Sequence, residues 1–187
     1  MHIAILGWGS LIWNPCDLSI DGEWLLGGPT LPIEFARISS DERLTLVIDE
    51  VNGTDVPTRY VRSGCDNLSD AIGNLRRREG NPLKERIGYV NVASGAERAW
   101  SRQQHPTACD RIKAWAQIHK WDAVVWTALT SNFPERLGEP YSAQAALRYF
   151  NGLEAEAKAR AVAYLSNAPP EVDTPFRRLA LVAAGPQ

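Results

Sequence analysis

The sequence predicts an α+β fold in which a curled, mixed or antiparallel, barrel-like β-sheet is surrounded by helices. Two observations predict it: strand-like patterns dominate the first 62 residues, and helical patterns are interspersed among the strands that follow. The chain has 187 residues, of which 44% are hydrophobic and 22% charged, enough for one sizeable core. We therefore expect a single domain spanning residues 1–187.

The N-terminal strand is the clearest element. Ile3-Ala4-Ile5-Leu6 is a continuous apolar run that Gly7 ends, a pattern typical of a strand buried on both faces. A loop is expected over residues 7–15, and the glycines and prolines of residues 21–32 indicate an irregular chain.

The segment after residue 32 is expected to form an antiparallel meander. Three runs with strand character follow one another, over residues 33–39, 43–49 and 57–62. Asp41-Glu42 and Asn52-Gly53 lie where turns would join them, and Asn-Gly is the stronger turn signal. The third run is the shortest and most polar, which suggests an edge strand.

The second half of the chain mixes helices with two more strands. Residues 67–78 have a helical pattern with Asn67 or Ser69 as the N-cap, and Gly80-Asn81-Pro82 ends it. The elements expected after it are a strand over 87–92, a helix over 105–120 with Pro106 in its first turn, a strand over 122–129, and helices over 142–153 and 154–165. The polar residues 94–106 suggest an exposed excursion.

Charge and cysteine content exclude several classes of protein. Lys and Arg number 20 against 22 Asp and Glu, so at a net charge of −2 the chain lacks the electrostatic attraction that nucleic acid or an anionic membrane requires. Cys16, Cys65 and Cys109 are too few and too scattered for a disulfide framework, which favours a reducing cytoplasm. No basic residue precedes the first apolar run, and no run approaches about 20 apolar residues, so neither a secretory signal nor a membrane span is expected.

The residues that could ligate a metal ion form no ligand pattern. The sequence has no Cys-x-x-Cys and no His-x-x-x-His pair, and Pro106 places His105 before the helix that carries Cys109. We therefore expect no metal site. Cys–His nucleophilic catalysis stays open, although no cysteine lies at an obvious helix start. Arg76-Arg77-Arg78 is interpreted as a solvated helix face.

The loop from Gly7 to Pro15 carries the strongest functional signal. Glycines after a buried strand let a ligand approach the backbone, and clustered N–H groups form an anion or oxyanion site. The alternative is a tight turn in which Trp8 and Trp13 anchor the core. A dinucleotide-binding loop is disfavoured because Ile12 stands in place of a third glycine and Pro15 prevents the following helix.

The segment Ile5-Leu6-Gly7-Trp8-Gly9-Ser10-Leu11-Ile12-Trp13-Asn14-Pro15 resembles the opening of the gamma-glutamylcyclotransferase superfamily, especially its ChaC-type branch. Members begin with a strand and a Tyr-Gly-Ser-Leu or Tyr-Gly-Ser-Asn loop, and here Trp8 stands in place of the usual Tyr. Further resemblances follow in the family's order, at residues 35–47, 75–80, 87–92 and 123–128. Residues 94–121 have no family counterpart and are expected to be a family-atypical insertion.

This resemblance implies a cofactor-independent reaction on a small gamma-glutamyl substrate. The substrate's own alpha-amine would attack its gamma-carbonyl, forming 5-oxoproline and releasing an amine or peptide. Glu79 lies in Leu75-Arg76-Arg77-Arg78-Glu79-Gly80, which resembles the family segment that carries the catalytic glutamate. It is implied as the group that accepts the amine proton and returns it to the leaving nitrogen.

The resemblance also implies a set of substrate-binding residues. The loop would hold the glutamyl group and stabilise the oxyanion through its backbone N–H groups, with Ser10 hydrogen-bonding the alpha-carboxylate. Arg37 and Arg43 are candidate carboxylate ligands, and Tyr89 is a candidate for the pocket lining. The implied binding residues are Gly7, Trp8, Gly9, Ser10, Leu11, Arg43 and Tyr89.

Two alternatives stay open. Glu79 ends a run of three arginines and could be a solvated helix-end residue, although the helix dipole disfavours a carboxylate there. The scaffold could also be a non-catalytic module for binding small molecules or proteins, with Trp8 closing its pocket. A dinucleotide-binding enzyme is a distant third interpretation. The leaving group and the oligomeric state are left open.

Overall fold

The computed structural model describes residues 1–80 and 82–184, and it has the expected α+β architecture. Its strands are β1 (Ile3–Gly7), β2 (Ile20–Leu25), β3 (Thr30–Ile38), β4 (Leu44–Ile48), β5 (Thr54–Pro57), β6 (Arg59–Ser63), β7 (Ile87–Asn91) and β8 (Ala123–Thr127). Its helices are α1 (Leu68–Arg78), the short 3-10 helix η1 (Lys84–Arg86), α2 (Ala99–Gln104), α3 (Pro106–Ile118), α4 (Phe133–Leu137), α5 (Ala143–Asn151), α6 (Ala155–Asn167) and α7 (Pro175–Ala184).

The strands form two sheets. The larger sheet has the order β2-β6-β1-β8-β7, with β1 and β8 parallel and the other pairs antiparallel. The smaller sheet has the order β4-β3-β5 and is antiparallel. Within the described residues the strands therefore form two sheets and do not close into a single barrel. The single curled, barrel-like sheet that the sequence predicts is not found.

The predicted meander is wrong in its strand order. The turn at Asp41-Glu42 does form a hairpin between β3 and β4, where Ser39 N–H donates to the Arg43 carbonyl at 2.9 Å. After Asn52-Gly53, however, the chain crosses to the other side of β3, because Gly53 packs against the backbone of Pro32 with no room for a side chain. The central strand is therefore β3.

The expected strand over 57–62 is divided between two elements, and its longer part, in β6, is not an edge. Thr58 separates β5 in the smaller sheet from β6 in the larger one, where β6 lies between β2 and β1. In the larger sheet one edge strand is β7 and the other is β2, in the segment predicted to be irregular. Its mostly exposed residues and the left-handed Gly22 give it no apolar alternation, so pairing with β6 alone defines it.

The first strand is buried on both faces, as predicted. Ile3 and Ile5 pack in one core cluster with Ala71 and Leu75 of α1. The intervening Ala4 and Leu6 lie in a second cluster that contains β3, β4 and the C-terminal helices. One face of the larger sheet is therefore covered by α1, and the other faces the smaller sheet.

Local signals placed the ends of two helices correctly. Asn67 caps α1, since its side chain accepts a hydrogen bond from the Asp70 N–H at 3.0 Å. Pro106 begins α3. The predicted stop of α1 includes Asn81, which lies outside the described residues.

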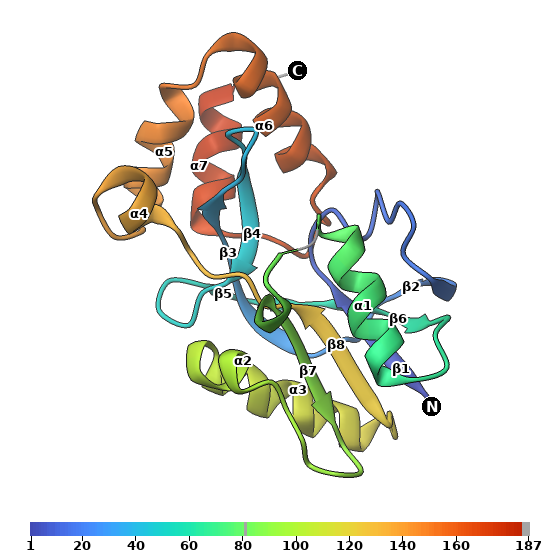
Figure 1. Cartoon of the computed structure of the whole chain (residues 1–187). Coiled ribbons are helices and arrows are strands. Elements are labelled where there is room, and N and C mark those ends of the chain that lie inside the picture. The colour runs from blue at the N-terminus through green and yellow to red at the C-terminus, as the bar shows by residue number, and fades with distance from the viewer. Residues whose placement is uncertain (81, 185–187) are drawn as a thin grey trace.

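The exposed excursion expected over residues 94–106 is found only in part: Ser94, Gly95 and Ala96 are exposed, but the segment also contains α2, which was not predicted and whose Ser101 is buried. Over the wider residues 94–121 the chain also contains α3, whose Cys109, Ile112 and Trp115 are buried in the larger core cluster. Figure 1 places α2 and α3 at one end of the molecule, and α5, α6 and the unpredicted α7 around the opposite ends of β3 and β4. None of the helices in the described part of the chain has the length and apolar character needed to cross a membrane.

Candidate active site

A cavity of about 390 Å³ lies where the two sheets meet, at the carboxyl ends of β1 and β8. Because these strands are parallel, the loops that follow them leave the same edge of the sheet, where ligands commonly bind in α/β sheets. Helix α6, the end of α1 and the hairpin of β3 and β4 complete the walls. The lining residues are Trp8, Gly9, Ser10, Leu11, Arg37, Ser39, Arg43, Thr45, Leu46, Val47, Arg78, Glu79, Gly80, Thr127, Leu129 and Tyr164.

Glu79 lines this cavity together with Gly9 and Ser10. It is the C-cap of α1, where its N–H donates to the Leu75 carbonyl at 3.0 Å. Gly80 follows with φ of 76°, a left-handed conformation that suits glycine and turns the chain away from the helix axis. The Glu79 side chain is only 15% exposed, so it is not a solvated helix-end residue.

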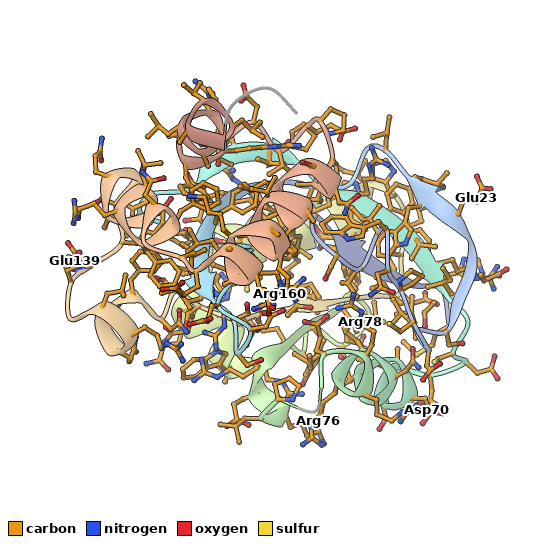
Figure 2. All side chains as sticks on the ribbon, turned by 90° about the horizontal axis from the view of Figure 1, so that it is seen from above. Glu23, Asp70, Arg76, Arg78, Glu139 and Arg160 are labelled. Atoms are coloured by element: carbon orange, nitrogen blue, oxygen red, sulfur yellow. The ribbon has the colours of Figure 1, made fainter. Side chains whose placement is uncertain are left out.

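Arg78 joins Glu79 to the loop after β1. Its guanidinium donates to Glu79 Oε1 at 2.6 Å, to Ser10 Oγ at 3.1 Å and to the Asn14 carbonyl at 2.6 Å. The interpretation of the three arginines as one solvated face therefore fails for Arg78, whose side chain is 10% exposed. In Figure 2 Arg78 lies toward the middle of the molecule, whereas Arg76 lies at its edge.

The loop after β1 holds backbone donors at the cavity wall. Ile12 N–H donates to the Gly9 carbonyl at 3.0 Å, and Asn14 N–H donates to the Ser10 carbonyl at 2.9 Å, so the loop is folded into successive turns. The N–H groups of Gly9 and Leu11 make no hydrogen bond to any described residue. These two N–H groups therefore have no acceptor in the described part of the protein, as the sequence-based hypothesis of an oxyanion site requires.

Tyr164 is a cavity residue that the sequence analysis missed. It comes from α6, and its hydroxyl lies so close to Gly9 that a Cβ there would be 2.8 Å from the oxygen. Burial raises the pKa of Tyr164 to about 12, helped by the negative charge of Glu79 and opposed by backbone hydrogen bonds from Leu46 and Ser10. The phenol is thus protonated at neutral pH and can donate a hydrogen bond.

No local sequence signal identifies Tyr164. An aromatic residue on the apolar stripe of an amphipathic helix usually belongs to the core, and Tyr164 is indeed 6% exposed. Its position beside the loop depends on tertiary contacts of its ring with Trp13 and with Phe35 of β3, which the sequence pattern does not reveal.

Of the two neighbouring residues Gly7 and Trp8, only Trp8 lines the cavity. Trp8 is buried in the cavity wall, where its Nε1–H donates to the Leu46 carbonyl at 3.4 Å, and it leaves the cavity open. Gly7 lies outside the lining. A Cβ on Gly7 would meet the Trp24 ring at 2.7 Å, so this glycine makes room for an aromatic side chain rather than for a ligand.

Both candidate carboxylate ligands lie at the cavity. Arg43 forms an ion pair with Asp41 at 2.8 Å, and its guanidinium lies 5.4 Å from the centre of the Tyr164 ring. Arg37 donates to the Thr130 carbonyl at 2.8 Å. Burial lowers the pKa of Arg37, and the positive charge of Arg86 lowers it further.

Tyr89 is not part of this cavity. It lies on β7 and packs partly against the core cluster beneath α1, beside Arg98, whose guanidinium is 4.8 Å from the centre of its ring. Together with Arg76 it lines a separate groove. The structure therefore brings Trp8, Gly9, Ser10, Leu11, Arg43 and Glu79 together at one cavity and separates Gly7 and Tyr89 from it.

The cavity lining includes no cysteine or histidine, so the described part of the site offers no Cys–His pair. Cys109 is fully buried, and burial raises its pKa to about 12. His105 is also buried, which lowers its pKa. Over residues 1–80 and 82–184, no cluster of three His, Cys, Asp or Glu side chains is arranged to hold a metal ion.

The site therefore combines a shielded carboxylate with free backbone donors and a protonated phenol. A carboxylate can accept and return a proton, and N–H and O–H donors can stabilise a developing oxyanion. The arrangement suits general acid–base chemistry at a carbonyl group.

No protein-family model matches the chain, and neither do curated proteins or solved structures.

Proposed function

We propose that this protein is a gamma-glutamylcyclotransferase-like enzyme, which cyclises a gamma-glutamyl amine or peptide to 5-oxoproline and releases the free amine. The observation that carries the proposal is the shared cavity of Glu79 and the Gly9–Leu11 loop. Arg78 links them directly, although Arg78 and Ser10 are 68 positions apart. These are the residues to which the family resemblance assigns catalysis and binding of the glutamyl group.

Glu79 would act first as the base. The nucleophile is the substrate's own alpha-amine, which is mostly protonated near neutral pH and must lose a proton before it attacks the gamma-carbonyl carbon. Glu79 accepts that proton. Its Oε1 is held by Arg78, whereas its Oε2 has no hydrogen-bond partner among the described residues and can take the proton.

The loop would then stabilise the intermediate. As the new C–N bond forms, the gamma-carbonyl oxygen becomes an oxyanion, to which the N–H groups of Gly9 and Leu11 and the hydroxyl of Tyr164 can donate. When the bond to the leaving nitrogen breaks, Glu79 returns the proton to that nitrogen. The attacking nitrogen loses its second proton as it becomes the lactam nitrogen, and the leaving amine takes that proton up. The products are therefore 5-oxoproline and a protonated amine, and no external nucleophile or cofactor is consumed.

The cavity is suitable for such a substrate. Its volume of about 390 Å³ lies within the ~300–1,000 Å³ typical of small-molecule sites. Arg43 and Arg78 line it beside the loop, and arginine suits the alpha-carboxylate of a glutamyl group. Trp8, which replaces the family's usual Tyr, forms part of the wall and leaves this volume unfilled. The hydroxyl of Tyr164 provides a phenol in the same cavity.

The test is release of 5-oxoproline from gamma-glutamyl dipeptides, glutathione and gamma-glutamyl amines. Glu79→Gln removes the proton acceptor while keeping the shape, so kcat is expected to fall about 10²- to 10⁴-fold. Glu85→Gln is the control, since Glu85 is an exposed carboxylate outside the cavity. Turnover that survives Glu79→Gln would contradict the mechanism. Absence of product from every compound would favour the non-catalytic binding module instead.

A further inference from the structure

A second groove adjoins the proposed active site. It has a volume of about 350 Å³ and shares Arg37 and Leu129 with the first cavity. Its other side is formed by Arg86 of η1 and by the segment that follows β8. A substrate group that extends from the first cavity past Arg37 would therefore lie in this groove.

The arginines of the two cavities differ in their charge partners. Arg43 is paired with Asp41 at 2.8 Å, and Arg78 is paired with Glu79 at 2.6 Å. Arg37 has only the Thr130 carbonyl as a hydrogen-bond acceptor and forms no ion pair with any described residue.

Arg86 is likewise without a carboxylate partner in the described part of the chain. Glu135 also lines the groove, and its negative charge acts on Arg37, but the residue is exposed and forms no ion pair with Arg37 or Arg86. Two neighbouring, partly buried cations are unfavourable for each other. A bound anion would compensate both charges.

Arg86 is held in place from two sides. Its guanidinium lies 3.9 Å from the centre of the Trp100 ring, close enough for a cation–π interaction. Its carbonyl accepts a hydrogen bond of 2.7 Å from Ala128 N–H, directly after β8. Trp100 belongs to α2, within the residues 94–121 that have no counterpart in the family pattern. The orientation of Arg86 is thus a feature of this chain's own insertion.

We propose that Arg37 and Arg86 bind a carboxylate carried by the leaving group. The inference rests on the proposed function and narrows it: the substrates are gamma-glutamyl amino acids or peptides that end in a carboxylate near the scissile bond, rather than gamma-glutamyl amines. The alpha-carboxylate of the glutamyl group is bound in the first cavity, so the unpaired arginines of the groove select the other end of the molecule. Arg86 gives a more specific test than Arg37, because Arg86 lines only the groove, whereas Arg37 lines both the groove and the first cavity.

The test compares gamma-glutamylglycine with gamma-glutamylglycinamide, which differ only in the charge of the leaving group. Binding is measured by calorimetry on the Glu79→Gln protein, so that the result does not depend on turnover. We expect the carboxylate compound to bind about 10- to 100-fold more tightly, as charge-assisted hydrogen bonds to arginine imply. Adding Arg86→Gln or Arg37→Gln should reduce this preference to threefold or less.

The control is Arg136→Gln, which removes a nearby exposed cation that lines neither cavity and should keep the preference. Equal affinities for the two compounds, or no binding of either, would overturn the inference. The inference would also be overturned if Arg37→Gln weakened the binding of both compounds while Arg86→Gln changed neither affinity. Arg37 would then bind the glutamyl group rather than the leaving group. If the preference holds while wild type releases no 5-oxoproline, the proposed function fails and the anion site stands.

Discussion

The guanidinium of Arg78 lies 2.6 Å from Oε1 of Glu79, its neighbour in the sequence, and both side chains are largely shielded from water. The same guanidinium reaches Ser10 and Asn14 in the loop after β1. One side chain therefore sets the position of the proposed base relative to the proposed oxyanion site. This arrangement explains how a carboxylate is retained at the C-terminus of a helix, where the dipole disfavours it.

Removing that link should impair turnover more than folding. Arg78→Met keeps much of the aliphatic stem but loses all three hydrogen bonds, so Glu79 and the loop are no longer held together. We expect kcat/KM for 5-oxoproline release to fall about 10- to 100-fold, as for a misplaced catalytic group. Arg76→Met is the matched control on the same helix, because Arg76 bonds only the Pro82 carbonyl outside the cavity. Equal effects of the two substitutions would contradict the positioning role.

The contact between Gly9 and Tyr164 can be tested with a double variant. A Cβ at Gly9 would lie 2.8 Å from the Tyr164 oxygen, whereas the next atoms, of Leu46, are 3.8 Å away. Gly9→Ala should therefore destabilise the protein by about 1–3 kcal/mol, the usual cost of overpacking a buried site. In a Tyr164→Phe background the clash is absent, so the same substitution should cost little.

Urea unfolding of the four proteins, wild type, both single variants and the double variant, measures this coupling. Additive effects would show that Tyr164 does not lie against Gly9. Tyr164→Phe alone should also lower kcat if the hydroxyl donates to the oxyanion, and full activity of this variant would remove Tyr164 from the mechanism.

Glu34 should make the stability of the fold depend on pH. This carboxyl is 1% exposed and accepts hydrogen bonds from Thr174 Oγ1 at 2.5 Å and from Phe35 N–H at 2.8 Å. Burial outweighs these bonds and raises the pKa of Glu34 above its ordinary value of 4.5. The native state then binds the proton more tightly than the unfolded state, so the contribution is favourable at low pH and is lost as pH rises through the native pKa.

The free energy of unfolding of Glu34→Gln relative to wild type should accordingly increase between pH 5 and pH 8. Urea titrations at several pH values measure it, with Glu23→Gln as the control, since Glu23 is exposed on β2. A difference between Glu34→Gln and wild type that stays constant across this range would show that Glu34 does not titrate as inferred.

Elements with strong local signals could be predicted from the sequence. The apolar run of β1, the Asn67 cap of α1 and Pro106 at the start of α3 each act within a few residues, and all three are found in the structure. Edge strand β2 could not be predicted, because its residues are mostly exposed without a regular apolar alternation, and pairing with β6 alone makes it a strand. The order of the strands also escaped prediction, since it depends on contacts such as that of Gly53 with Pro32.

By itself the sequence determined the class of fold, the helices and strands with clear periodicity, and the candidate residues Gly9, Ser10 and Glu79. Only the tertiary structure decided that Glu79 faces a cavity rather than solvent, that Arg78 turns inward, and that Tyr164 joins them. The physical reason is that periodicity and capping describe a residue's own helix or strand. The direction and shielding of a side chain at the end of a helix depend instead on segments that fold against it from far along the chain.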